Sequence, residues 1–331
     1  MSAAYLQELT LRLALGAAAL EADWRDRHAG WLRAQQASDG GFGGREGESD
    51  PYYTAFALRA LWVLGQLDDQ TGAAAADFLR TRLSERESII DLISLIFASA
   101  IVEMAVGEVV LPDDDTTWRS NVASLLASLR TEDGGFAKTP EGRAGSTYQT
   151  FLSVLAYELI DVPIPEPDRI EAFLESQRHP EGGYLEIRAA KRAGVNPTAA
   201  AIGTLKALDR LDQIDPAPVR DFLAEMQSDE GGLTANTRIP FADLLSTFTG
   251  LLTLADLQAT SAVNKFESSV RTAGAVAAGV ASTGVLGLGQ GLSVVKEKAM
   301  AAGFAFRKVQ LIIVALGGAM ASLGLARSIM D

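Results

Sequence analysis

The sequence predicts an all-α fold in which repeated helical hairpins close into an α/α toroid. Pairs of glycines recur at residues 40–41, 134–135, 182–183 and 231–232, at intervals of 94, 48 and 49 residues, and 94 is two steps of 47. A large apolar residue stands nine positions before each pair, and a copy that has lost its glycines fits at Asp77-Phe78-Leu79. This period predicts five copies of one helical hairpin. They start near residues 31, 78, 125, 173 and 222.

Each copy is predicted to hold an amphipathic outer helix, a glycine turn and an apolar inner helix. The paired glycines allow a positive φ after a helix end. Short polar residues are expected to cap the inner helices, namely Asp50, Ser146 or Thr147, Asn196 and Asp243, with Pro51 and Pro197 at first helical positions. The inner helices, at 55–64, 151–159, 199–208 and 247–257, are apolar nearly all round. Helices of that kind are buried on most sides, which places them in an inner ring.

Two further predicted helices, one at each end of the five copies, complete the toroid. Residues 3–22 form an apolar stripe through Leu6, Leu9 and Leu13, which suits an inner helix that closes a ring. A helix from about Ala262 gives twelve helices in six hairpins. We therefore expect one toroidal domain over residues 1–261 and a separate C-terminal tail over 262–331.

Composition limits the function. The 331 residues include no cysteine, so neither a disulfide nor a thiolate metal site can form. The net charge of −13 argues against nucleic acid as a partner. The tail differs from the rest: residues 262–331 hold seven Lys or Arg and three acids, a balance of +4 that leaves −17 for the remainder.

The tail is predicted to add a helical hairpin that associates with a membrane through residues 272–326. No charged residue occurs in 272–295 or in 309–326, and basic residues flank both stretches. A span needs roughly 20 apolar residues, and basic loops lie on the cytoplasmic side. We therefore expect a cytoplasmic protein that is membrane-associated through this tail. The alternative is a soluble hairpin packed on the toroid or on a partner.

The repeat resembles that of the prenyltransferase and squalene-cyclase family. Gln35-x-x-x-Asp39-Gly40-Gly41-Phe42, with the 47-residue period, carries the resemblance, and residues 39–45 with 52–54 are most similar to the β subunit of protein geranylgeranyltransferases. The resemblance covers residues 1–261. It implies a central apolar funnel that binds an isoprenoid or isoprenyl diphosphate, and a helical-repeat partner subunit.

The family's zinc ligands are an Asp, a Cys and a His. In this sequence their positions fall on Gly194, Asn196 and the neighbourhood of Ser246. The only histidines, His28 and His179, belong to different copies. Zinc sites use about four ligands with N or S among them, so we expect no zinc, no other metal and no cofactor. The family's diphosphate-binding Arg and Lys fall on Arg188 and Lys191, for which the alternative is a solvated loop.

The resemblance also suggests the residues that line the funnel. Tyr53, Tyr148 and Phe248 lie near the starts of inner helices, as do Phe56 and Phe151, and the alternative for each is core packing. Residues 113–116, Asp-Asp-Asp-Thr, resemble part of the cyclase acid motif, but they precede an outer helix and fit a solvated helix cap better.

Three functions follow as hypotheses. The first is a prenyltransferase-like toroid that binds an isoprenoid, including a divergent zinc-free transferase with no catalytic residue assigned. The second is a non-catalytic, membrane-associated scaffold or binding module. The third, a terpenoid cyclase, is disfavoured by the position of the acid motif.

Overall fold

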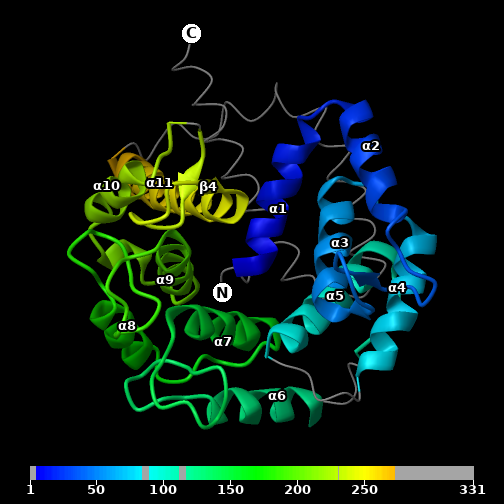
Figure 1. Ribbon diagram of the computed structural model, residues 1–331, viewed down its shortest axis with the longest axis horizontal. Coiled ribbons are helices and arrows are strands. Elements are labelled where there is room, and N and C mark those ends of the chain that lie inside the picture. Colours follow the sequence, from blue (N-terminus) through cyan, green and yellow to red (C-terminus); the bar gives the residue numbers. More distant parts are fainter. Residues whose placement is uncertain (1–4, 84–88, 112–116, 230, 273–331) are drawn as a thin grey trace. The chain divides into compact units, whose positions relative to one another are not determined.

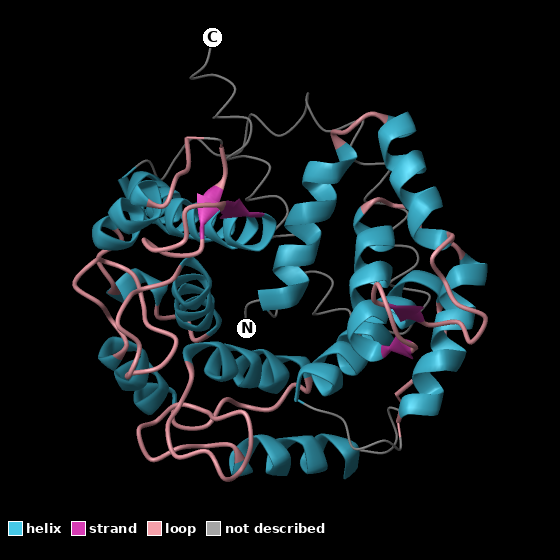
Figure 2. Cartoon of the chain, in the orientation of Figure 1, coloured by secondary structure: helices cyan, strands magenta, loops and turns pink. Residues whose placement is uncertain are grey.

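The computed structural model describes residues 5–83, 89–111, 117–229 and 231–272, which are mainly helical (Figures 1 and 2). These residues fall into two units, one before and one after the gap at 112–116. The first unit contains α1 (Tyr5–Ala18), α2 (Ala22–Arg33), β1 (Phe42–Gly43), β2 (Ser49–Asp50), α3 (Pro51–Val63), α4 (Asp69–Arg82) and α5 (Ile89–Val106).

The second unit holds the remaining elements. They are α6 (Thr117–Ser128), α7 (Thr147–Leu159), α8 (Pro167–Ser176), α9 (Val195–Ala207), η1 (Leu211–Gln213), α10 (Ala217–Glu225), β3 (Leu233–Thr234), β4 (Ala242–Asp243) and α11 (Leu244–Thr272). The strands pair as two antiparallel hairpins, β1 with β2 and β3 with β4. Each hairpin connects an outer helix to the inner helix that follows it.

The inner helices form the core of each unit. In the first unit α3 packs against α5 and α1, and in the second unit α9 lies between α7 and α11 (Figure 1). The largest fully buried side chains come from both the inner and the outer helices and include Leu58, Leu79, Ile101, Phe173 and Phe222. The predicted all-α class and the alternation of outer and inner helices are confirmed by these elements.

Three of the four predicted inner-helix caps are present. Asp50, Ser146 and Asp243 accept hydrogen bonds from the backbone N–H groups three residues later, at 2.7, 3.1 and 2.7 Å. The prediction for Asn196 is wrong. The helix cap is Gly194, and the Asn196 Oδ1 atom instead accepts a hydrogen bond from Thr249 Oγ1 at 2.7 Å. The reason is tertiary, because α11 brings Thr249 alongside the start of α9.

Three of the glycine turns pack closely against the next outer helix. Gly182 has a φ of +95°, and a Cβ on it would lie 2.2 Å from the Pro218 carbonyl oxygen of α10. A Cβ on Gly183 would lie 2.7 Å from the Phe222 ring. Only glycine permits this approach. The same contacts recur at Gly40 and Gly41 with Ala74 and Phe78, and at Gly134 and Gly135 with Arg169 and Phe173.

A threonine in α3, α7, α9 and α11 completes the repeat and was not predicted, and it is fully buried in the first three of these helices. Thr198 Oγ1 accepts a hydrogen bond from Tyr184 N at 2.9 Å and donates one to Gly194 O at 2.7 Å. The Oγ1 atom therefore satisfies a backbone N–H that no helix or sheet ladder reaches. The equivalent acceptors for the N–H after the glycine pair are Thr54, Thr150 and Thr247.

The first and last helices differ in part from those that the sequence predicts. The predicted helix over residues 3–22 ends at Ala18, and α2 starts at Ala22. No separate helix starts near Ala262, because α11 continues to Thr272. The predicted domain boundary at 261–262 therefore lies inside a helix, and the division into two domains stays a prediction. Residues 113–116 and most of the tail, from 273 onward, lie outside the described residues, and so does the predicted membrane association of that part.

One described helix, α5, is long and apolar enough to cross a membrane. Half of its most apolar window is buried, and it packs against α3 and α4. These contacts are those of an inner helix of the second copy.

Candidate functional site

These threonines define a common register for α3, α7, α9 and α11, and this register reveals an apolar face. Tyr52, Tyr148, Asn196 and Leu245 each lie two residues before the threonine of their own helix. In the second unit, Tyr148 is 41% exposed and Leu245 is 60% exposed. Phe151 and Phe248 share the position three residues later, and Phe248 is 44% exposed. Apolar side chains therefore stay accessible on the first two turns of α7 and α11.

The predicted funnel residues do not share one register. Tyr148, Phe151 and Phe248 belong to the apolar face just described. Tyr53 instead occupies the position of Gln149 and Ser246, and its ring lies against Gly44. Phe56, 54% exposed, lies three residues after Tyr53 on α3. In the first unit the residue equivalent to Tyr148 is Tyr52, and the sequence pattern alone does not distinguish Tyr52 from Tyr53.

Arg188 and Lys191 lie on the loop of residues 185–193, and both are exposed. This loop lies against the first turn of α7. Thr147 donates from its N to Glu186 O at 2.9 Å and from its Oγ1 to Leu185 O at 2.6 Å. The loop is therefore anchored to the first turn of α7 at residues 185 and 186, and Arg188 lies two residues beyond this anchor. Within the part of the chain that the structure describes, neither cation has an acidic partner.

Glu186, on the same loop, places a carboxyl group against the start of α7. Its Oε1 atom accepts hydrogen bonds from Ser146 Oγ and, at 3.4 Å, from Tyr148 N. Burial raises the pKa of Glu186, and the two hydrogen bonds oppose that rise. The side chain thus binds the N-terminal end of α7, where backbone N–H groups favour an anion. Sequence reasoning missed this residue because the contact joins positions forty residues apart.

The residues at the family's zinc positions do not fit zinc. Gly194 has no side chain, and the Asn196 oxygen is bonded to Thr249. Ser246 is fully buried and donates from its Oγ to Asp243 Oδ2 at 2.7 Å. An amide and a hydroxyl are not the N or S ligands that a protein zinc site uses. Across the described residues, no group of three or more His, Cys, Asp or Glu side chains is placed to hold a metal.

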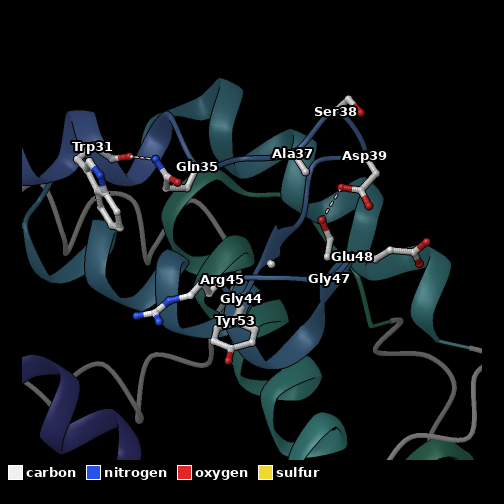
Figure 3. A pocket seen from close by; sticks show the side chains of 12 residues that line it. Trp31, Gln35, Ala37, Ser38, Asp39, Gly44, Arg45, Gly47, Glu48 and Tyr53 are labelled. Carbon is white, nitrogen blue, oxygen red and sulfur yellow. Dashed lines mark hydrogen bonds between the residues drawn. The ribbon is translucent and has the colours of Figure 1, made fainter.

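A second accessible region is a groove of about 960 Å³ in the first unit (Figure 3). Trp31, Arg45 and Tyr53 line it, and the Trp31 side chain is 64% exposed. Asp39 fixes its rim by accepting hydrogen bonds from Ser49 Oγ at 2.8 Å and Gly41 N at 3.0 Å. The groove offers an indole, a phenol and a guanidinium in one open depression.

Comparison with known proteins assigns the family. The model of the prenyltransferase alpha-alpha toroid domain matches residues 1–161 and 150–284, so the chain belongs to this family. No curated protein matches the chain significantly in sequence. Together with the helices described above, the family assignment confirms the predicted α/α toroid fold.

A solved structure has the same fold. The Candida albicans protein geranylgeranyltransferase-I, complexed with GGPP, matches with a TM-score of 0.58 at 12% sequence identity. The match covers 72% of this chain and 78% of that one. An identity this low supports the fold alone, so ligand and activity have to be argued from the residues.

Proposed function

We propose that this protein binds an isoprenyl diphosphate, with the isoprenoid chain on the apolar face at the starts of α7 and α11 and the diphosphate at Arg188 and Lys191. The observation that carries the proposal is the register of the inner helices. It gives Tyr148 and Leu245 one equivalent position and Phe151 and Phe248 the next, and Tyr148, Leu245 and Phe248 are exposed.

These exposed apolar side chains suit the isoprenoid end of the ligand. Burying an apolar side chain of this size stabilises a complex by roughly 1.5–3 kcal/mol, so aromatic and leucine side chains that face solvent favour an apolar ligand. Tyr148 and Leu245 share one register position, and Phe151 and Phe248 share the next. An extended isoprenoid chain suits such a row of side chains. The fungal relative of known structure, which was solved with GGPP, supports this class of ligand.

The polar end of the ligand is matched by the loop of residues 185–193. A diphosphate is bound well by cationic donors. Arg188 and Lys191 are exposed and have no acidic partner among the described residues. The loop is anchored to Thr147 at the start of α7, one residue before Tyr148. Charge and apolar surface therefore meet in one unit, as an amphipathic ligand requires. The proposal assigns binding, and a transfer reaction without the family's zinc would need a catalytic group that these residues do not identify.

Titration calorimetry with geranylgeranyl diphosphate tests the proposal. The variant Arg188→Ala/Lys191→Ala should raise the dissociation constant at least about tenfold, which corresponds to roughly 1.4 kcal/mol. The matched control is Lys138→Ala/Arg143→Ala, which removes two exposed cations from the equivalent loop of the preceding copy. This control should bind as the parent protein does.

Two probes separate the parts of the ligand. Geranylgeraniol tests the apolar face without the diphosphate, and inorganic diphosphate tests the loop alone. Failure of the parent protein to bind either geranylgeranyl compound would overturn the proposal and would leave the scaffold hypothesis. Equal losses in both double variants would show that the effect is general charge and would remove Arg188 and Lys191 from the site.

A further inference from the structure

The inner helix α3 carries an arginine where its counterparts carry uncharged residues. Arg59 lies five residues after Thr54, the threonine that sets the register of this helix. The same position holds Leu155 in α7, Gly203 in α9 and Leu252 in α11. The packing of the repeat therefore gives no reason for a guanidinium group at this position.

Two nitrogen atoms of the Arg59 guanidinium are buried without a hydrogen-bond partner. They are Nε and Nη2, whose N–H bonds point the same way and form an edge with which arginine binds a carboxylate through two parallel hydrogen bonds. Arg25, Arg82 and Arg130 each have only the Nε atom in this condition. In the part of the chain that the structure describes, Arg59 is the one arginine that presents a complete edge.

The surroundings of Arg59 do not neutralise its charge. Its Cζ atom lies 5.5 Å from the centre of the Phe97 ring of α5, a contact that offsets part of the cost of burying a cation. Burial lowers the pKa of Arg59 to about 10, and the nearby Tyr5 of α1 opposes that fall. Among the described residues of the first unit, no acidic side chain pairs with this guanidinium.

The second unit shows how this chain treats a comparable charge. Lys206 of α9 has its Nζ atom 2.9 Å from Oδ1 of Asp256 on α11, and Asp256 is buried. A buried charge is costly unless an opposite charge or hydrogen bonds compensate it. The second unit thus supplies an anion for its inner-helix cation, whereas the described first unit supplies none for Arg59.

We propose that Arg59 binds the carboxylate of an apolar compound in the first unit, beside α1 and α5, with the two carboxylate oxygens accepting hydrogen bonds from Nε and Nη2. One carboxylate satisfies both nitrogens and neutralises one positive charge. A phosphate group carries closer to two negative charges, and no second basic side chain interacts with Arg59.

The face of α3 that carries Arg59 suits the apolar part of this ligand. Tyr52 and Phe56 lie seven and three residues before Arg59, on the same side of the helix, and their ring centres are 4.9 Å apart. Both α1 and α5 pack against α3 (Figure 1). Arg59 is only partly buried as a residue, so a ligand reaches the guanidinium from its accessible side. The site belongs to the first unit and does not depend on the isoprenyl diphosphate proposed above.

Titration calorimetry of the full chain with dodecanoate tests the proposal. Arg59→Met keeps much of the side-chain length and removes the charge, and it should raise the dissociation constant at least about tenfold. The matched control is Arg27→Met, an exposed arginine on α2 of the same unit, and it should bind as the parent protein does. Dodecanol measures the apolar part alone and should not distinguish the parent protein from Arg59→Met.

The ionisation of the bound carboxyl group gives a second measurement. In dodecanoate that is isotope-labelled at the carboxyl carbon, nuclear magnetic resonance should show a lowered pKa on the parent protein, because a guanidinium favours the ionised form. Arg59→Lys keeps the charge and loses the two-donor edge, so it should bind more weakly than the parent protein. Thermal unfolding checks the fold, and Arg59→Met should be at least as stable as the parent protein without ligand, because it removes a buried charge that has no partner.

Four results would overturn the proposal. The first is equal affinity of the parent protein and Arg59→Met for dodecanoate, and the second is no binding of dodecanoate by the parent protein. The third is stabilisation of the parent protein alone by inorganic phosphate without dodecanoate binding, which would assign a phosphate instead. The fourth is a matching loss of geranylgeranyl diphosphate binding in Arg59→Met, which would place Arg59 in the site proposed above. Dodecanoate binding that needs Arg59, in a protein that does not bind geranylgeranyl diphosphate, would support this inference while the proposed function failed.

Discussion

The Phe222 ring lies directly against Gly183, so close that a Cβ on the glycine would stand 2.7 Å from the ring. This contact joins the glycine turn of the fourth copy to the outer helix of the fifth copy, and it recurs between Gly135 and Phe173 and between Gly41 and Phe78. Three repeats are thus fixed to their successors by a glycine and an aromatic ring, the nearest-neighbour arrangement on which repeat proteins depend.

Gly183→Ala should destabilise the protein by about 1–3 kcal/mol, the usual cost of forcing an extra methyl into a packed contact. The new Cβ would meet the Phe222 ring and Thr198 Oγ1, at 2.7 and 2.8 Å. Urea unfolding followed by circular dichroism measures the change. The control is Gly30→Ala in α2, where a Cβ meets nothing within 4 Å, and helix propensity predicts equal or higher stability there. Equal stabilities for both variants would contradict the glycine–ring contact.

Thr198→Val should lower the free energy of unfolding by about 1–3 kcal/mol, because the change keeps the shape and leaves a buried N–H without an acceptor. Thr198 is fully buried, and its Oγ1 accepts the hydrogen bond of Tyr184 N. Thr139→Val, at an exposed loop position, is the control. A Thr198→Val protein as stable as the control would show that the hydrogen bond contributes little.

Glu186 should make stability depend on pH in the mildly acidic range. Burial raises the pKa of Glu186 above its ordinary value of 4.5. The folded protein therefore favours the protonated carboxyl group, so its contribution to stability is complete below pH 4.5 and is lost as pH rises through the folded-state pKa. Glu186→Gln should remove this decline, while Glu141→Gln, on the exposed face of the equivalent loop, should keep it. Unfolding midpoints measured across this pH range test the prediction. Parallel profiles for the parent protein and for Glu186→Gln would contradict a contribution of Glu186 to the pH dependence.

Phe248→Ala should weaken geranylgeranyl diphosphate binding roughly tenfold, through the loss of about 1.5 kcal/mol of apolar contact. Val109→Ala is the control, since Val109 is 52% exposed and lies outside the inner helices. Calorimetry measures binding by both variants. An equal or larger loss for Val109→Ala would contradict a ligand contact at Phe248.

The purified protein should bind geranylgeranyl diphosphate without stoichiometric zinc. The residues at the family's ligand positions are Gly194, Asn196 and Ser246, and the last two are engaged with Thr249 and Asp243. Elemental analysis by plasma mass spectrometry, together with calorimetry in a zinc chelator, measures both. One zinc per chain would mean that a different set of ligands holds it.

The sequence alone was sufficient for the repeat and therefore for the fold. Its period placed an outer and an inner helix in every copy, and Asp50, Ser146 and Asp243 proved to cap their helices. These features follow from local chemistry, since a glycine after a helix and a short polar cap act within a few residues.

The tertiary structure decided the features that depend on neighbouring copies. Asn196 looked like a cap and instead accepts a hydrogen bond from Thr249. Glu186 reached Ser146 across forty residues, and Tyr148 proved to be in register with Tyr52 rather than with Tyr53. Leu251 is exposed while Val154 and Ile202 in the same position are buried. The local pattern is the same in the four copies that keep the glycine turn, so the sequence alone cannot distinguish an inner-helix position that packing buries from one that stays exposed; only the tertiary structure decides between them.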